Sequence, residues 1–282
     1  MHSLVSTDWL ADAIGRPDLR PSSLRVIDAT LLDPALGRDA RAEFAAGHVP
    51  GARFLDLASL RDVASPLPNT LPSSDTVAMR LGALGIDAAT RVVLYDDSPW
   101  RSAARAWWLF KSYGLGDVAI LDGGLAAWRG EGRPLETGEP AETAAPIEVR
   151  FNPARLRTIE QMRANLASRG EQVVDARSPA RFSGEEPDPH GAAPGHIPGS
   201  TNLHYARLFS ADGRWKRGDD LAAAFAGVGV DLDAPMVATC GSGVTAGVLA
   251  FGAHLLGREM AVYDGSWSEW GGDPSTPKEV GA

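Results

Sequence analysis

Short apolar runs alternate along the chain with segments whose apolar residues have helical spacing. Apolar runs of strand length occupy residues 24–29, 91–95, 118–121, 172–176, 236–239 and 261–263. Helical spacing is seen at Val77, Leu81 and Leu84, and over residues 102–113 and 245–256. Strands that alternate with helices form mostly parallel sheets. The pattern therefore predicts an α/β fold with helices flanking the sheets.

The same succession of signals occurs twice. A strand ending at Asp28 is followed 20 residues later by His48 in Gly-His-Val-Pro-Gly, and a strand ending near Asp175 is followed 21 residues later by His196 in Gly-His-Ile-Pro-Gly. An interval of six residues separates an aspartate from a tryptophan late in each half, at Asp122 and Trp128 and at Asp264 and Trp270. Matching order and matching intervals indicate a tandem duplication.

We expect a first domain at residues 1–135, a linker at 136–156 and a second domain at 157–282. Residues 130–153 are rich in Gly, Pro and Glu without an apolar period, which is typical of a linker that runs over the surface. The second domain opens with a capping-box pattern at residues 158–161. From about Gly271 onward the sequence predicts a frayed tail.

Composition excludes several classes of function. The 282 residues carry a net charge of −9 and no basic run, which argues against nucleic acid and anionic membranes as partners. No apolar run reaches the ~18 residues that span a bilayer, and residues 1–14 lack the pattern of a signal peptide. A single cysteine excludes an internal disulfide and a Cys-rich zinc site. We expect a soluble cytoplasmic protein; the reaction expected below implies no metal or organic cofactor.

That cysteine, Cys240, stands where an apolar strand ends. Gly241, Ser242 and Gly243 follow, and then an apolar helix begins. Glycines let backbone N–H groups converge, and a helix N-terminus favours an anion, so this place suits a thiolate. An isolated cysteine is more often a buried packing residue. The glycine turn favours a nucleophile, because a packing cysteine needs no such turn.

The first half has Asp96 at the position of Cys240. Pro99 removes one N–H from the following loop and Trp100 adds bulk, so this loop does not reproduce the glycine turn. We therefore expect a non-catalytic first domain and a catalytic second one.

Residues that recur in both halves are interpreted as requirements of the fold. They are His48 and His196, Trp128 and Trp270, and Asp28 and Asp175, for which a bond to a nearby turn is the simpler account. Thr239 is interpreted as a strand residue.

These residues resemble the two-domain rhodanese family of sulfurtransferases over nearly the whole chain. The loop Cys240-Gly241-Ser242-Gly243-Val244-Thr245-Ala246 is similar to that of the branch acting on 3-mercaptopyruvate, whereas thiosulfate-preferring members tend to carry basic residues after the cysteine. The resemblance implies that Cys240 and Ser242 are catalytic. It also implies that Gly241, Ser242, Gly243, Val244 and Thr245 form an anion loop around a persulfide.

The resemblance also assigns the donor site. Arg181 matches an arginine that binds the donor carboxylate, and a guanidinium suits this task through its bidentate geometry. His190 stands where that branch has a second arginine, and an imidazole offers one hydrogen bond in place of a charged fork. The branch also uses an acidic residue and a histidine near the serine. Their positions here hold Ala58 and Asn69, which do not support a proton relay.

The expected reaction is a double displacement. Cys240 takes sulfur from 3-mercaptopyruvate and passes it to a thiol acceptor such as thioredoxin or glutathione, or to cyanide. The alternatives are a thiosulfate:cyanide sulfurtransferase and a non-catalytic sulfur carrier or binding module. A phosphatase of related fold needs an arginine six residues after the cysteine, where this chain has Ala246.

Overall fold

The computed structural model describes residues 2–15, 24–140 and 144–281. They divide into two compact units. Unit 1 contains the described residues up to Arg61, residues 72–151 and residues 212–214; unit 2 contains residues 62–71, 152–211 and 215 onward. Each unit thus includes a short segment from the other half of the sequence.

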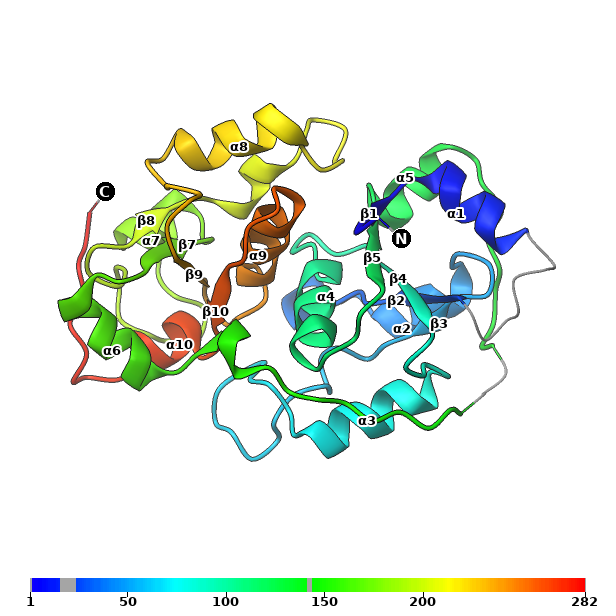
Figure 1. Cartoon of the computed structure of the whole chain (residues 1–282), viewed down its shortest axis with the longest axis horizontal. Helices are drawn as coiled ribbons and strands as arrows, with labels where there is room; N and C mark the ends of the chain where they lie inside the picture. The colour runs from blue at the N-terminus through cyan, green and yellow to red at the C-terminus, as the bar shows by residue number, and fades with distance from the viewer. Residues whose placement is uncertain (1, 16–23, 141–143, 282) are drawn as a thin grey trace. The chain divides into compact units, whose positions relative to one another are not determined.

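Each unit contains a parallel sheet of five strands among the described residues, as the alternating pattern predicts (Figure 1). The order in unit 1 is β1-β5-β4-β2-β3, and in unit 2 it is β6-β10-β9-β7-β8, which is the same order copy for copy. The strands of unit 1 are β1 Leu4–Val5, β2 Leu24–Asp28, β3 Arg53–Phe54, β4 Arg91–Tyr95 and β5 Val118–Leu121. The strands of unit 2 are β6 Leu156–Arg157, β7 Gln172–Asp175, β8 Thr201–Asn202, β9 Met236–Thr239 and β10 Ala261–Tyr263.

Helices cover both sheets. Those of unit 1 are α1 Thr7–Ile14, α2 Ala40–Ala46, α3 Ser74–Ala83, α4 Ala103–Ser112 and α5 Gly124–Gly130. Those of unit 2 are α6 Ile159–Ser168, α7 Pro179–Ser183, α8 Gly218–Ala226, α9 Ala246–Leu255 and α10 Ser266–Trp270. Short 3₁₀ turns lie at Pro34–Leu36, Pro153–Arg155 and Tyr205–Leu208.

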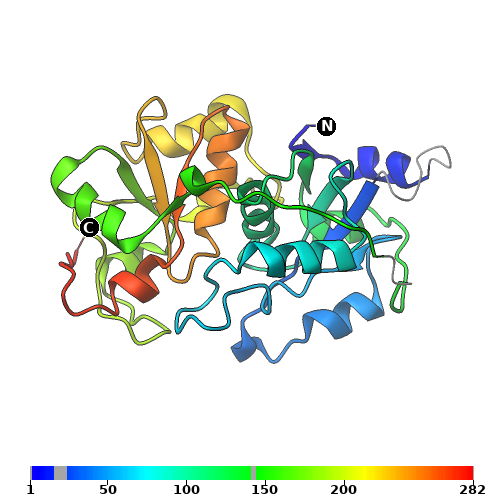
Figure 2. The ribbon, with the colours of Figure 1, turned by 60° about the horizontal axis from the view of Figure 1, so that its bottom comes forward.

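The two units bury equivalent helices on their sheets. Helix α4 packs on β4 and β5, and α9, orange in Figure 2, packs on β9 and β10. Another apolar cluster in unit 1 joins Leu10 of α1, Phe44 of α2 and Trp128 of α5 to the strands. In unit 2 the corresponding cluster includes Met162 of α6 and Trp270 of α10. Burial of these apolar side chains stabilises the layers.

Six strands and the principal helices lie where the apolar pattern predicts them. The capping box is also confirmed, since Thr158 accepts a bond from the Gln161 N–H while the Gln161 side chain accepts one from the Thr158 N–H. The strands without a prediction are β1, β3, β6 and β8. Each has two residues, too few to show a strand period.

The predicted frayed tail is wrong. His196 and Glu279 exchange two backbone hydrogen bonds, at 2.8 and 3.0 Å, and the Gly281 N–H donates to Ser183 O. Trp270 Nε1 donates to Pro277 O at 2.8 Å, and Thr276 is buried. These contacts are mostly made by the backbone, which the pattern of apolar side chains does not reveal.

The predicted linker forms backbone hydrogen bonds with unit 1 over its first residues. Residues 141–143 of the linker lie outside the described part of the chain. His48 and Glu136 exchange two backbone hydrogen bonds at 2.9 Å, as His196 and Glu279 do in the other copy. Gly138 N–H donates to Ala45 O. In each unit the Gly-His-x-Pro-Gly turn therefore holds the chain segment that follows the last helix of that unit, α5 in unit 1 and α10 in unit 2. Among the described residues, no helix is both long enough and apolar enough to cross a membrane.

Candidate active site

Cys240 follows β9 directly and begins the loop that leads into α9. Its side chain is 1% exposed. The Gly243 N–H, one of the predicted loop donors, donates to Cys240 Sγ at 3.1 Å. Gly243 has φ +84°, a conformation that favours glycine and turns this N–H back toward the sulfur. A backbone hydrogen-bond donor is therefore aimed directly at the sulfur.

The start of α10 holds the Cys240 loop in place. The Trp267 N–H donates to Cys240 O at 3.0 Å, and the Ser268 N–H and hydroxyl both donate to Gly241 O at 2.8 Å. Val244 is buried, and its carbonyl accepts from the Gly247 N–H at the beginning of α9. The loop is therefore built by neighbouring elements rather than by its own sequence alone.

Ser266 is a site residue that the sequence reasoning missed. Its Oγ accepts a bond from the Cys240 N–H at 3.3 Å, donates to Tyr263 O at 2.8 Å and lies 3.9 Å from Cys240 Sγ. Ser266 has φ +51°, which is uncommon for a residue with a side chain. The available signal was the alignment of the two halves, because the first half has Gly124 at this position.

Asn69 contacts Ser242 within unit 2. Its amide nitrogen Nδ2 donates to Ser242 O at 3.3 Å and to Ser242 Oγ at 3.2 Å. Since a carbonyl oxygen can only accept, the nitrogen of the amide must face Ser242. The hydroxyl of Ser242 then accepts from Asn69 and keeps its own proton for another acceptor. A side-chain amide does not act as an acid or a base, so Asn69 can hold the Ser242 hydroxyl but not pass a proton on.

The segment that carries Asn69 is anchored beside the loop. The Leu71 N–H donates to Asp264 Oδ2 at 2.6 Å, and the Asp62 N–H donates to Thr70 O. Asn69 itself has φ +59°, a conformation that asparagine tolerates better than most residues. This anchoring gives the amide of Asn69 a defined position over Ser242.

Arg181, on α7, lies against the Cys240 loop. A Cβ atom on Gly241 would be 2.8 Å from Arg181 Nη2 and 3.5 Å from Cζ, so the guanidinium occupies the space that a side chain at position 241 would need. Arg181 Nη2 donates to Asp188 Oδ2 at 2.6 Å. Arg181 Nε is buried and has no hydrogen-bond partner among the described residues.

His190 lies in the same turn as Asp188. Its side chain is exposed, and its backbone N–H donates to Asp188 Oδ1 at 2.9 Å. The structure therefore places Arg181 at the cysteine loop and gives Asp188, a residue absent from the sequence-based predictions, a direct bond to its guanidinium. Thr245, the last of the predicted loop residues, caps α9 without a side-chain bond.

The corresponding loop of unit 1 holds a carboxylate. Asp96 Oδ2 accepts from the Ala103 N–H at 2.7 Å and Oδ1 accepts from the Ser98 N–H at 3.1 Å. Burial raises the pKa of Asp96 to about 6. The N–H groups of Ser98 and Ala103 thus bind the carboxylate of Asp96 and are not available to a ligand.

The residues repeated in both halves have structural contacts, as predicted. His48 Nδ1 bonds Phe44 O and His196 Nδ1 bonds Phe182 O, at 2.8 and 3.0 Å, and each imidazole stacks on that phenylalanine. Equivalent bonds join Trp128 Nε1 to Pro134 O, Trp270 Nε1 to Pro277 O, Asp28 Oδ1 to Thr30 and the Asp175 carboxylate to Arg177. Thr239 is the last residue of β9, as expected.

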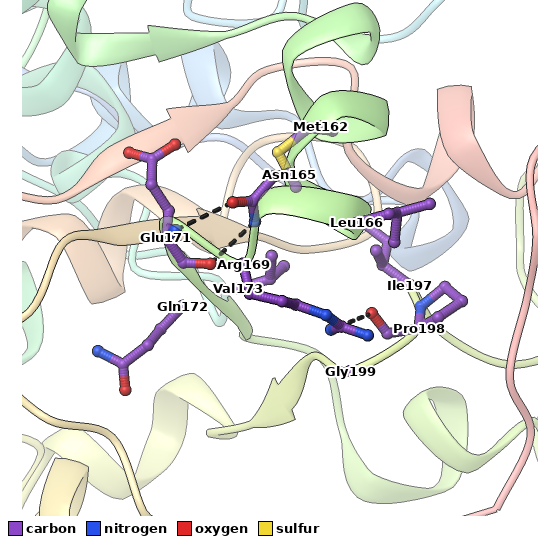
Figure 3. A pocket seen from close by; sticks show the side chains of 10 residues that line it. All are labelled: Met162, Asn165, Leu166, Arg169, Glu171, Gln172, Val173, Ile197, Pro198 and Gly199. Carbon is purple, nitrogen blue, oxygen red and sulfur yellow. Dashed lines mark hydrogen bonds between the residues drawn. The ribbon is translucent and has the colours of Figure 1, made fainter.

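Two cavities contain none of these site residues. One, of about 150 Å³, lies between α6 and the turn at Ile197, Pro198 and Gly199. Figure 3 shows Arg169 crossing it, and Arg169 Nη1 donates to Pro198 O at 3.2 Å. The other, of about 300 Å³, is in unit 1 and includes Arg41 and Arg80. The chemistry-bearing residues are therefore gathered around the Cys240 loop and not in these cavities.

Comparison with known proteins identifies the domains. The model of the rhodanese-like domain matches residues 6–131 and 158–273. Human 3-mercaptopyruvate sulfurtransferase is 43% identical over 273 residues, which cover 95% of this chain and 92% of that protein. Bovine thiosulfate sulfurtransferase is 42% identical over 275 residues, with the same two coverages. A crystal structure from Escherichia coli, described as that of a 3-mercaptopyruvate sulfotransferase, has 35% identity and a TM-score of 0.85, and the match covers 95% of this chain and 99% of that one. Overall identity is thus nearly equal for relatives named after two different sulfur donors.

Proposed function

The chain belongs to the rhodanese family, and we propose that it is a sulfurtransferase that takes sulfur from 3-mercaptopyruvate through a persulfide on Cys240. The observation that carries the choice of donor is the uncharged pair after the cysteine. Gly241 and Ser242 bring no cation to the sulfur, and the guanidinium of Arg181, which lies against Gly241, has its charge offset by Asp188. A small dianion benefits from fixed cations next to the nucleophile, whereas a carboxylate farther from the transferred sulfur is served by one arginine.

In the first half-reaction the thiolate of Cys240 attacks the sulfur of 3-mercaptopyruvate. An S–S bond forms, the C–S bond of the donor breaks, and its electron pair passes to the enolate of pyruvate. The Gly243 N–H, 3.1 Å from Sγ, favours the attacking thiolate. Ser242 accepts from Asn69 and so has its hydroxyl proton available for the leaving enolate or the persulfide.

In the second half-reaction a thiolate acceptor or cyanide attacks the outer sulfur of the persulfide. The S–S bond breaks, its electron pair returns to Cys240, and the acceptor leaves with the sulfur. We propose a thiol acceptor such as thioredoxin or glutathione in a reducing cytoplasm, where the single cysteine stays reduced. Turnover compared among thioredoxin, glutathione and cyanide at equal donor concentration tests this choice.

The proposal is tested by intact mass after incubation with 3-mercaptopyruvate and no acceptor. We expect the wild-type protein to gain the mass of one sulfur atom and the Cys240→Ser variant to gain none. The Cys240→Ser variant should also lose turnover by about 10³-fold or more, as expected for removal of a nucleophile. Full turnover by this variant would disprove the mechanism.

The second candidate is a thiosulfate:cyanide sulfurtransferase, because thiosulfate sulfurtransferases are as similar to the chain as the mercaptopyruvate enzymes are. The ratio of kcat/KM for the two donors distinguishes them, and a clear preference for thiosulfate would refute the choice of 3-mercaptopyruvate. His190→Arg adds a second guanidinium in the turn next to Arg181. If His190 limits donor binding, this variant should lower KM for 3-mercaptopyruvate.

A further inference from the structure

We propose that Asp188 determines donor specificity: it holds the guanidinium of Arg181 against Gly241 and offsets its charge, so that the site favours a donor with one carboxylate over a small dianion. This inference rests on the proposed sulfurtransferase function.

Asp188 is built into its place. Its side chain is 3% exposed, although the turn around it lies at the surface. Oδ2 accepts from Arg181 Nη2 at 2.6 Å, and Oδ1 accepts from the His190 N–H at 2.9 Å. Both oxygens of the carboxylate are therefore fixed, one by the guanidinium and one by the backbone of its own turn. A charge-assisted bond of this length restricts the guanidinium strongly.

The guanidinium is restricted from the opposite side as well. Gly241, the residue after the nucleophile, leaves space that Arg181 Nη2 enters to within 2.8 Å of where a Cβ atom would stand. Nε is buried and has no partner among the described residues, so it remains a donor without an acceptor. The guanidinium is therefore held between Asp188 on one side and the backbone of Gly241 on the other.

The charges of the site explain the selectivity. The negative charge of Asp188 offsets that of Arg181 at 2.6 Å. The interaction energy of a bound anion with the charge of Asp188 is proportional to the charge of that anion. Thiosulfate carries twice the charge of a monocarboxylate, so the acidic neighbour of Arg181 disfavours thiosulfate about twice as strongly.

The test is Asp188→Asn, with kcat/KM measured for thiosulfate and for 3-mercaptopyruvate. Asparagine removes the charge and keeps one oxygen, which can accept from the His190 N–H; its amide nitrogen is a donor and cannot replace the bond to Arg181, so the variant also releases the guanidinium. We expect the thiosulfate to 3-mercaptopyruvate ratio to rise about threefold or more, mainly through a lower KM for thiosulfate. The rise should shrink as ionic strength increases. Asp188→Glu, which restores the charge, should return the ratio toward that of the wild type.

Asp273→Asn is the matched control. Asp273 also pairs with an arginine, Arg163, at 2.6 Å in unit 2, so this variant removes the same charge from a pair of the same length. We expect its donor ratio to equal that of the wild type. An unchanged ratio in Asp188→Asn, or an equal loss for both donors, would overturn the role of Asp188.

The two proposals fail in different ways. If the wild-type protein forms no persulfide with either donor, the sulfurtransferase function itself is wrong. If the persulfide forms in the wild type and in Asp188→Asn while the donor ratio stays constant, only the specificity role of Asp188 is wrong. An increase in thiosulfate turnover by Asp188→Asn also shows directly that the variant is folded.

Discussion

The two units share one strand order and one way of fixing their Gly-His-x-Pro-Gly turns, but they differ at the end of a central strand. After β9 the chain presents a thiol that receives one backbone N–H. After β4 it presents Asp96, whose carboxylate takes up two N–H groups of its own loop. The comparison teaches that duplication preserves the scaffold, while the two copies differ in the side chain that meets the N–H groups of this loop: a thiol in one and a carboxylate in the other.

A second difference lies beside that loop. Gly124 in unit 1 and Ser266 in unit 2 both have left-handed backbone, with φ +58° and +51°. A Cβ atom on Gly124 would stand 2.5 Å from Asp96 O. In unit 2 the equivalent position holds a hydroxyl that accepts from the Cys240 N–H. A side chain at this position is therefore compatible with the cysteine loop and not with the aspartate loop.

Exchanging these two residues should give the largest effect. We expect Gly124→Ser to lower the free energy of unfolding by about 2–4 kcal/mol, because the backbone of the Asp96 loop must move. Ser266→Gly relieves the backbone strain but leaves the buried Cys240 N–H and Tyr263 O without this partner, so it should lower the free energy of unfolding by about 1–2 kcal/mol. It should reduce kcat about tenfold through loss of the hydroxyl 3.9 Å from Cys240 Sγ. Denaturant unfolding and steady-state kinetics measure the two quantities.

Gly132→Ser is the control for Gly124→Ser. Gly132 also has positive φ, +67°, but a Cβ atom there would meet nothing within 4 Å. We expect this substitution to cost about 1 kcal/mol from backbone conformation alone. Equal losses in the two glycine variants would mean that the contact with Asp96 O has no consequence.

The histidines of the twin turns should give smaller and matching effects. His48→Ala and His196→Ala each remove a bond to a carbonyl and a ring stacked at about 4 Å on phenylalanine. We expect each variant to lose about 1–3 kcal/mol of unfolding free energy. The kcat of the folded protein should stay near that of the wild type in both. A fall in kcat for His196→Ala but not for His48→Ala would assign His196 to the chemistry and contradict its structural role.

Much of the difference between the two units could be predicted from the sequence, because each half has its own apolar runs and its own copy of the repeated residues. Apolar runs show the central strands, which are buried on both faces, and the repeated intervals show the duplication. Cys240 is marked by the glycine turn after it. The sequence also indicates that Asp96 replaces the nucleophile. These features depend on residues close together in the chain.

The site contacts that could not be predicted from the sequence are made between segments that are not adjacent in the chain. Ser266 reaches Cys240 from 26 residues away, and Glu279 pairs with His196 across the unit. Asp188 is absent from the sequence-based predictions, because its pairing with Arg181 depends on the path of the chain between them. Composition and periodicity carry no information on where such backbone and side-chain partners meet.

The last expected effect is a difference between the two copies in how their stability responds to pH, and it is small at any single pH step. Asp28 is buried, and desolvation raises its pKa to about 6 despite bonds from Thr30. Its counterpart, Asp175, has the guanidinium of Arg177 as a partner at 2.7 Å. Because folding raises the pKa of Asp28, its contribution to stability is complete below pH about 4 and is lost as pH rises through about 6. This contribution changes by at most about 1.4 kcal/mol per pH unit.

Asp28→Asn should therefore flatten the pH dependence of unfolding between pH about 4 and 6, because the amide keeps an acceptor for Thr30 and does not titrate. Asp12→Asn, at an exposed position of α1, serves as the control and should leave the slope unchanged. The measurement is the free energy of unfolding from denaturant titrations at closely spaced pH values. Parallel curves for the wild type and Asp28→Asn would show that Asp28 is not the group whose protonation stabilises unit 1. The contrast between an aspartate bonded to Thr30 and one paired with a guanidinium would then have no energetic consequence.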